Sequence, residues 1–81
     1  MIQNEVGREL AVNKLEPKTI VVLRAANRPA VTMWVAVVGM DFVAFYAGVT
    51  KTTFIAQLRE DGSLADDAGR VIKVYEYLGE P

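Results

Sequence analysis

The chain contains no cysteine and no histidine. Without cysteine it cannot form disulfides, and without either residue it lacks the ligands that dominate structural zinc sites. Both absences also exclude a Ser-His-Asp triad, a thiol nucleophile and an imidazole general base. The one serine, Ser63, falls in a predicted turn. We therefore expect no enzymatic activity, no metal site and no cofactor.

An excess of charge of either sign is also lacking, since nine basic and ten acidic residues give a net charge of −1. Domains that hold nucleic acid by its phosphates usually carry a basic excess, so nucleic acid is not an expected partner. The longest apolar run, Met33 to Met40, is far shorter than the roughly 20 residues that span a bilayer. The opening residues MIQNEV do not resemble a signal peptide. These features predict a cytoplasmic protein without membrane association.

With 81 residues, the chain has room for one domain, covering 1–81. A domain of this size buries only about 60% of its unfolded surface, and small domains often gain stability by oligomerising. The hydrophobic fraction of 52% is slightly above that of a typical soluble domain. Size and composition together predict a homo-oligomer.

Turn signals divide the chain at short, regular intervals, which is typical of small all-β domains. Runs of β-branched and apolar residues predict strands over 19–26, 30–38, 42–47, 52–59 and 71–78. In the fourth run Phe54, Ala56 and Leu58 share one face, and in the fifth Ile72, Val74 and Leu78 do. The expected fold is mostly β: a small antiparallel five- or six-stranded barrel or curled sheet, SH3-like or OB-like.

The first 13 residues fit two structures. Ile2, Val6 and Leu10 are spaced as on one helical face, with Asn4 as a plausible N-cap, which predicts a short N-terminal helix. A glycine inside this segment costs a helix about 1 kcal/mol, and the alternation of Leu10 with Val12 suits a short strand. Both alternatives stay open.

Three aspartates, Asp61, Asp66 and Asp67, lie close together in the sequence. They do not follow the EF-hand pattern, because Gly62 comes directly after Asp61 and no glutamate closes a twelve-residue loop. Asp and Gly favour tight turns. We therefore predict turns at 61–63 and 66–69, with the last glycine at a positive φ.

The central strands carry apolar residues on both faces, whereas a sheet with one wet face alternates. With 39–41 as the turn, Trp34 lies opposite Tyr46 and Val35 opposite Phe45. A turn shorter by one residue would place Trp34 opposite Phe45, and both faces would stay apolar. One face then shows Trp34, Ala36, Val38, Phe42, Ala44 and Tyr46, and the other shows Met33, Val35, Val37, Val43 and Phe45. Only one face can line the core. The other must be covered by the N-terminal segment, a second copy or another protein.

Two groups of side chains are candidates for binding. Lys73, Tyr75 and Tyr77 share one face of the last strand, which Arg70 precedes, and such a face can stack bases and hold phosphate; it also suits an ordinary β-surface. Around the 27–29 turn, arginines lie close in sequence to the one tryptophan, a frequent hot-spot pairing. The candidate binding residues are Arg24, Arg28, Trp34, Tyr46, Arg70, Lys73, Tyr75 and Tyr77.

The sequence predicts a non-enzymatic, homo-oligomeric interaction module that binds another protein. A stoichiometric inhibitor or an assembly component, of the kind that phages and mobile elements encode, fits this description. The alternative is a small-ligand binder, with an anionic or nucleotide-like molecule held at an oligomer interface by Trp34, Tyr46 or Tyr75 and by Arg28 or Arg70. A weaker alternative is single-stranded nucleic acid on the last strand.

Overall fold

Five runs of β-branched and aromatic residues form the long strands in the computed structural model, which describes residues 6–79. These strands are β2 (Ile20–Ala25), β3 (Val31–Val38), β4 (Phe42–Ala47), β5 (Thr52–Leu58) and β7 (Val71–Tyr77). Two shorter strands, β1 (Val6–Glu9) and β6 (Leu64–Ala65), and a 3-10 turn, η1 (Val12–Lys14), complete the elements. Each predicted strand is present, with ends that differ by at most one residue. The predicted inward face of Leu78 is wrong, because β7 ends at Tyr77 and Leu78 is 56% exposed.

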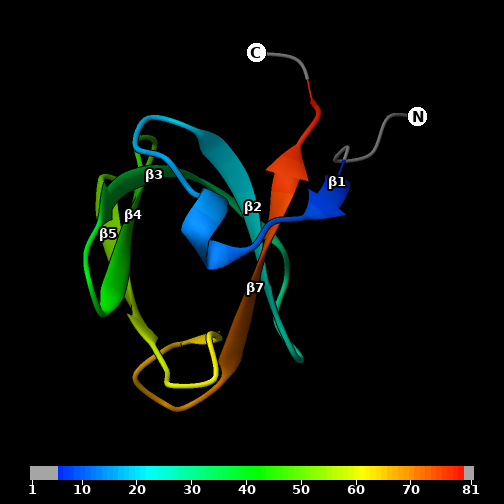
Figure 1. Ribbon diagram of the computed structural model, residues 1–81. Helices are drawn as coiled ribbons and strands as arrows, with labels where there is room; N and C mark the ends of the chain where they lie inside the picture. The colour runs from blue at the N-terminus through cyan, green and yellow to red at the C-terminus, as the bar shows by residue number, and fades with distance from the viewer. Residues whose placement is uncertain (1–5, 80–81) are drawn as a thin grey trace.

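The sheet closes on itself as a six-stranded antiparallel barrel (Figure 1). Strands β2 to β7 pair in sequence order, and β7 then pairs with β2 from Val21↔Glu76 to Ala25↔Ile72. The two-residue strand β6 completes the ring between β5 and β7. Strand β1 adds to the free side of β7. The predicted mostly-β barrel is confirmed, with the connectivity of a closed meander.

Aliphatic and aromatic side chains from every barrel strand fill the interior. Phe45 and Phe54 lie opposite each other on β4 and β5, and their ring centroids are 6.2 Å apart. No polar or charged side chain is buried anywhere in residues 6–79, so burial of apolar surface alone stabilises this interior. The core cluster consists of Leu15, Val21, Leu23, Met33, Val35, Val43, Phe45, Ala56, Leu64, Ile72 and Val74.

The N-terminal segment forms a strand rather than a helix where the structure describes it. Val6–Glu9 pairs with β7, and the Leu10 N–H donates to the Val74 carbonyl at 2.7 Å. Ile2 and Asn4, on which the helix alternative depended, lie outside the described residues. Among residues 6–79 no helix is long and apolar enough to cross a membrane.

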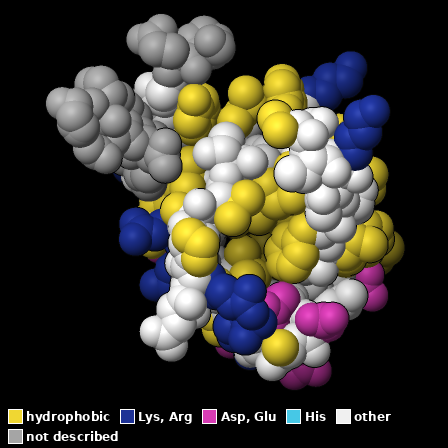
Figure 2. All heavy atoms as spheres, turned by 180° about the vertical axis from the view of Figure 1, so that it is seen from behind, with side chains coloured by type: hydrophobic (Ala, Val, Ile, Leu, Met, Phe, Trp, Pro, Cys, Tyr) yellow, Lys and Arg dark blue, Asp and Glu magenta, His cyan; other side chains and the backbone are white. Residues whose placement is uncertain are grey.

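The two ends of the barrel differ. The segment around η1 packs Leu10, Val12 and Leu15 against the core at the end where β3 stops and β4 starts. The antiparallel order brings the loops 26–30, 48–51 and 66–70 together at the other end. No segment comparable to η1 covers that end in the described part of the chain, so it stays open (Figure 2).

The central hairpin has the predicted pairs Trp34↔Tyr46 and Val35↔Phe45, but the predicted faces of Val37 and Val38 are wrong, since Val38 pairs with the core residue Val43. A β-bulge lies between Val35 and Val37, so that Val37 pairs with Ala44 on the outer face instead of lining the core. The core face is the one with Met33, Val35, Val43 and Phe45. The bulge shifts the face of the residues that follow it, which strict alternation could not show.

Both aspartate turns form as predicted. Asp61 accepts hydrogen bonds from the Ser63 N–H at 2.9 Å and hydroxyl at 2.7 Å. Asp66 accepts from the backbone N–H groups of Ala68 and Arg70. Gly69 has φ of +85°, a conformation that costs glycine little. The second turn thereby fixes the start of β7 at the open end of the barrel.

Candidate functional site

The outer face of β3, β4 and β5 is the first candidate site, because these three strands contain no Lys, Arg, Asp or Glu. Register places Trp34, Tyr46 and Thr53 in one cross-strand row and Val37, Ala44 and Ile55 in the next. We call this surface, made by these six residues, the uncharged face.

Four large side chains of the uncharged face are open to solvent. The exposed fractions are 44% for Trp34, 49% for Val37, 38% for Tyr46 and 52% for Ile55. Ala44 is buried among them. Of the coverings that the sequence left open, the N-terminal segment is not on this face as far as the structure describes it, since β1 lies beside β7 and η1 at the barrel end. The uncharged face therefore has no covering within residues 6–79.

The open end of the barrel is the second candidate site. Figure 2 shows it as a hollow with hydrophobic side chains at its floor and charged side chains at its margin. The cavity has a volume of about 300 Å³. We call it the open mouth; it is lined by Leu23, Arg24, Ala25, Arg28, Pro29, Val31, Met33, Phe54, Asp66, Arg70 and Ile72.

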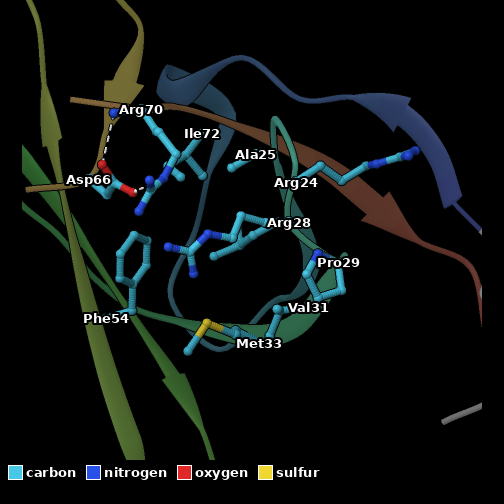
Figure 3. A pocket seen from close by; sticks show the side chains of 11 residues that line it. Arg24, Ala25, Arg28, Pro29, Val31, Met33, Phe54, Asp66, Arg70 and Ile72 are labelled. Atoms are coloured by element: carbon cyan, nitrogen blue, oxygen red, sulfur yellow. Dashed lines mark hydrogen bonds and ion pairs between the residues drawn. The ribbon is translucent and has the colours of Figure 1, made fainter. Parts of the chain in front are cut away.

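Two arginines of the open mouth have different environments. Arg70 is held by Asp66, because its Nε–H donates to the Asp66 Oδ2 at 3.1 Å. Arg28 comes from the β2–β3 turn and extends across the cavity toward Phe54 (Figure 3). Its guanidinium makes no hydrogen bond or ion pair to any residue in 6–79. Arg28 is therefore the arginine that extends over the cavity without a carboxylate partner among residues 6–79.

The Asp66 carboxylate is a fixed acceptor at this margin. The backbone N–H of Arg70 lowers the pKa of Asp66 below its ordinary value of 3.8, the Ala68 N–H and the Arg70 charge act in the same direction, and desolvation opposes them. A carboxyl group whose pKa is lower in the folded state stabilises the fold above the unfolded-state pKa. This contribution is lost as the pH falls through the lower, folded-state pKa.

We therefore expect the free energy of unfolding to fall as the pH drops below about 4, and to fall less steeply in Asp66→Asn. The amide can still accept a hydrogen bond in the turn but does not titrate. Urea unfolding at neutral and acidic pH measures the difference. Asp67→Asn is the control, because it removes a neighbouring exposed carboxylate without changing these hydrogen bonds. Identical pH dependence in wild type and Asp66→Asn would contradict this role.

The predicted binding residues fall into three places. Trp34 and Tyr46 form a cross-strand pair on the uncharged face. Arg28 and Arg70 lie together in the open mouth, and Arg24 lines its margin with its side chain pointing away from the cavity (Figure 3). Within one copy, the structure thus does not bring the Trp34–Tyr46 pair to the arginines of the mouth.

The remaining candidates lie on the outer face of β2 and β7. Arg24 pairs in register with Lys73, and its guanidinium carbon lies 5.9 Å from the centre of the Tyr75 ring. Tyr75 and Tyr77 are half-buried beside β1. Arg24 therefore occupies the ring face on which a base would stack, which does not favour the nucleic-acid alternative.

Val37, Ile55 and Phe54 belong to the candidate sites but are not among the binding residues predicted from the sequence. Val37 reached the outer face through the bulge, and Ile55 was not counted as part of the apolar surface although it alternates with Phe54 and Ala56. Phe54 was predicted as a core residue, and it also lines the open mouth. The absence of charge from three consecutive strands was the signal that could have indicated the uncharged face.

No protein-family model, curated protein or solved structure matches the chain. What the fold and its surfaces define is a class: a small closed antiparallel β-barrel with an uncharged outer face and one open end.

Proposed function

We propose that the protein is a non-catalytic interaction module in which two copies associate through the uncharged face. The observation that carries the proposal is the exposure of Trp34, Val37, Tyr46 and Ile55 on three strands without a charged residue. Cores of protein interfaces are depleted of charge and enriched in aromatic residues. A large apolar surface of this kind on a soluble protein marks a contact site.

A second copy is the occupant that this surface favours. Homodimer interfaces are more apolar than those of transient complexes, and steering and selection of a foreign partner usually depend on complementary charges. The uncharged face offers no such charges, and it presents none that would repel its own copy. A two-fold axis through this face would place the same apolar rows on each other in both copies.

The test is an arginine placed on the uncharged face. In a symmetric dimer Ile55→Arg introduces two guanidinium groups into one apolar contact, and the like charges and their desolvation oppose association. We expect the wild type to be dimeric in a concentration series by light scattering after size exclusion. Ile55→Arg should raise the dimer Kd more than about a hundredfold, because such juxtapositions cost several kcal/mol.

Val49→Arg is the matched control, because Val49 is a 99% exposed residue of the β4–β5 loop and lies outside the uncharged face. It makes the same kind of change and should leave the Kd unchanged. Circular dichroism should show that both variants are folded. A wild type that stays monomeric at every concentration, or an Ile55→Arg variant as dimeric as Val49→Arg, would overturn the proposal; the first result would leave the face to a different protein.

A further inference from the structure

We propose that the open mouth is a binding site for a small amphipathic carboxylate, with an apolar body inside the barrel end and its anionic head on Arg28. This site is separate from the uncharged face and does not depend on self-association. The inference stands on the shape of the cavity, on its apolar floor and on the uncompensated charge of one arginine.

The interior of the mouth favours an apolar body. Its floor consists of Leu23, Met33 and Ile72, and these side chains belong to the barrel core. Ala25, Val31 and Phe54 line the walls above them. The volume of about 300 Å³ lies at the small end of the range for ligand pockets, which indicates a small molecule. A ligand with many polar groups would leave them without partners against such walls.

The charge at the margin favours one anionic group. Asp66 already accepts hydrogen bonds from two backbone N–H groups and from Arg70, so it does not neutralise Arg28. The guanidinium of Arg28 projects over the cavity from the 26–30 turn, and no residue in 6–79 pairs with it (Figure 3). A guanidinium matches a planar carboxylate with two parallel hydrogen bonds. The expected ligand is therefore a carboxylate with a small apolar part.

The experiment titrates the full chain with octanoate, followed by two-dimensional amide NMR. We expect shifts centred on the residues of the open mouth, among them Ala25, Phe54 and Arg70. Octanol, with the same chain and no charge, should bind at least about tenfold more weakly, because the charge-assisted hydrogen bond is lost. Octylammonium should bind more weakly still, because its charge repels Arg28.

Arg28→Gln should weaken octanoate binding at least about tenfold, because it removes the charge from a side chain that makes no contact needed for folding. Lys14→Gln is the control, since it removes a charge from an exposed residue of η1 at the other end of the barrel, outside the open mouth. Octanoate should still bind the Ile55→Arg variant, which is expected to be monomeric. The octanoate experiment therefore tests the open mouth even if the proposed dimer does not form. No shifts at the mouth, equal binding of octanol, or an unaffected Arg28→Gln would overturn the inference.

Discussion

Phe45→Ala is expected to lower the free energy of unfolding by about 3–5 kcal/mol, as truncation of a fully buried phenylalanine does. Phe45 is completely buried at the centre of β4, with Val35 and Phe54 as its cross-strand neighbours. Removing the ring leaves a cavity and also removes the stacked contact with Phe54. Domains of this size have total stabilities of roughly 4–12 kcal/mol, so this loss removes at least about a quarter of the total.

Urea unfolding monitored by circular dichroism measures this loss. Wild type and variant are compared at one fixed low concentration, because association adds to the apparent stability of the folded state. Val49→Ala shortens a 99% exposed side chain and should change the free energy of unfolding by less than about 0.5 kcal/mol. A loss below about 1 kcal/mol in Phe45→Ala would mean that the ring is not at the centre of the core.

The long strands could be predicted because each has a clear local signal. Phe42–Ala47 was predicted with both ends correct, and the alternation of Phe54, Ala56 and Leu58 gave the correct inward face of β5. Turn residues at 61–63 follow β5, and those at 66–69 precede β7, so they indicate where these two strands end and begin. Local propensity and periodicity agree along these segments, which is where prediction from sequence works.

The short strands could not be placed from the sequence, which left strand and helix open for the N-terminal segment, because the signal of these strands is tertiary. Leu64–Ala65 has two residues and no periodicity, yet it pairs with both β5 and β7 and closes the barrel. Val6–Glu9 is a strand only because the free side of β7 offers it a partner. The bulge before Val37 has the same origin, since nothing in a run of alternating apolar residues indicates where one residue goes unpaired.

The two candidate sites also differ in how far the sequence predicts them. Both apolar faces of the central hairpin are visible in the sequence, and the pair Trp34↔Tyr46 follows from the turn. The open mouth combines Arg28, Phe54 and Arg70 from three separate segments that meet only when the meander closes. A linear sequence gives the chemistry of these side chains but not their common orientation.

The distribution of charge on the outer surface of the barrel supports the proposed contact at the uncharged face. Elsewhere charged side chains accompany the exposed strands, as with Lys73 on β7, Arg24 on β2 and the Arg8–Glu76 ion pair beside β1. The strands β3 to β5 have no such residue. In a monomer these strands are in contact with solvent, and the side chain of Trp34, the one tryptophan of the chain, is 44% exposed. That residue therefore provides both a probe and a test of the contact.

Trp34→Ala is expected to weaken dimer association strongly while lowering the stability of the monomer only slightly. Trp34 lies in the uncharged face rather than in the core, so its loss should lower monomer stability by only about 1–2 kcal/mol, less than a fully buried tryptophan would. Tryptophan at the centre of an interface typically contributes at least 2 kcal/mol, so the dimer Kd should rise at least about thirtyfold. Sedimentation equilibrium of wild type and variant measures the two constants.

The wild type supplies an independent readout, because Trp34 is the only tryptophan. Its fluorescence maximum should shift to shorter wavelength as concentration rises, since a second copy removes the indole from water. Met40→Ala is the control: Met40 is 95% exposed in the β3–β4 turn, and its loss should alter neither the Kd nor the emission. A Trp34→Ala variant that unfolds as readily as Phe45→Ala would place the indole in the core. One that dimerises with the wild-type Kd would place the contact on another surface.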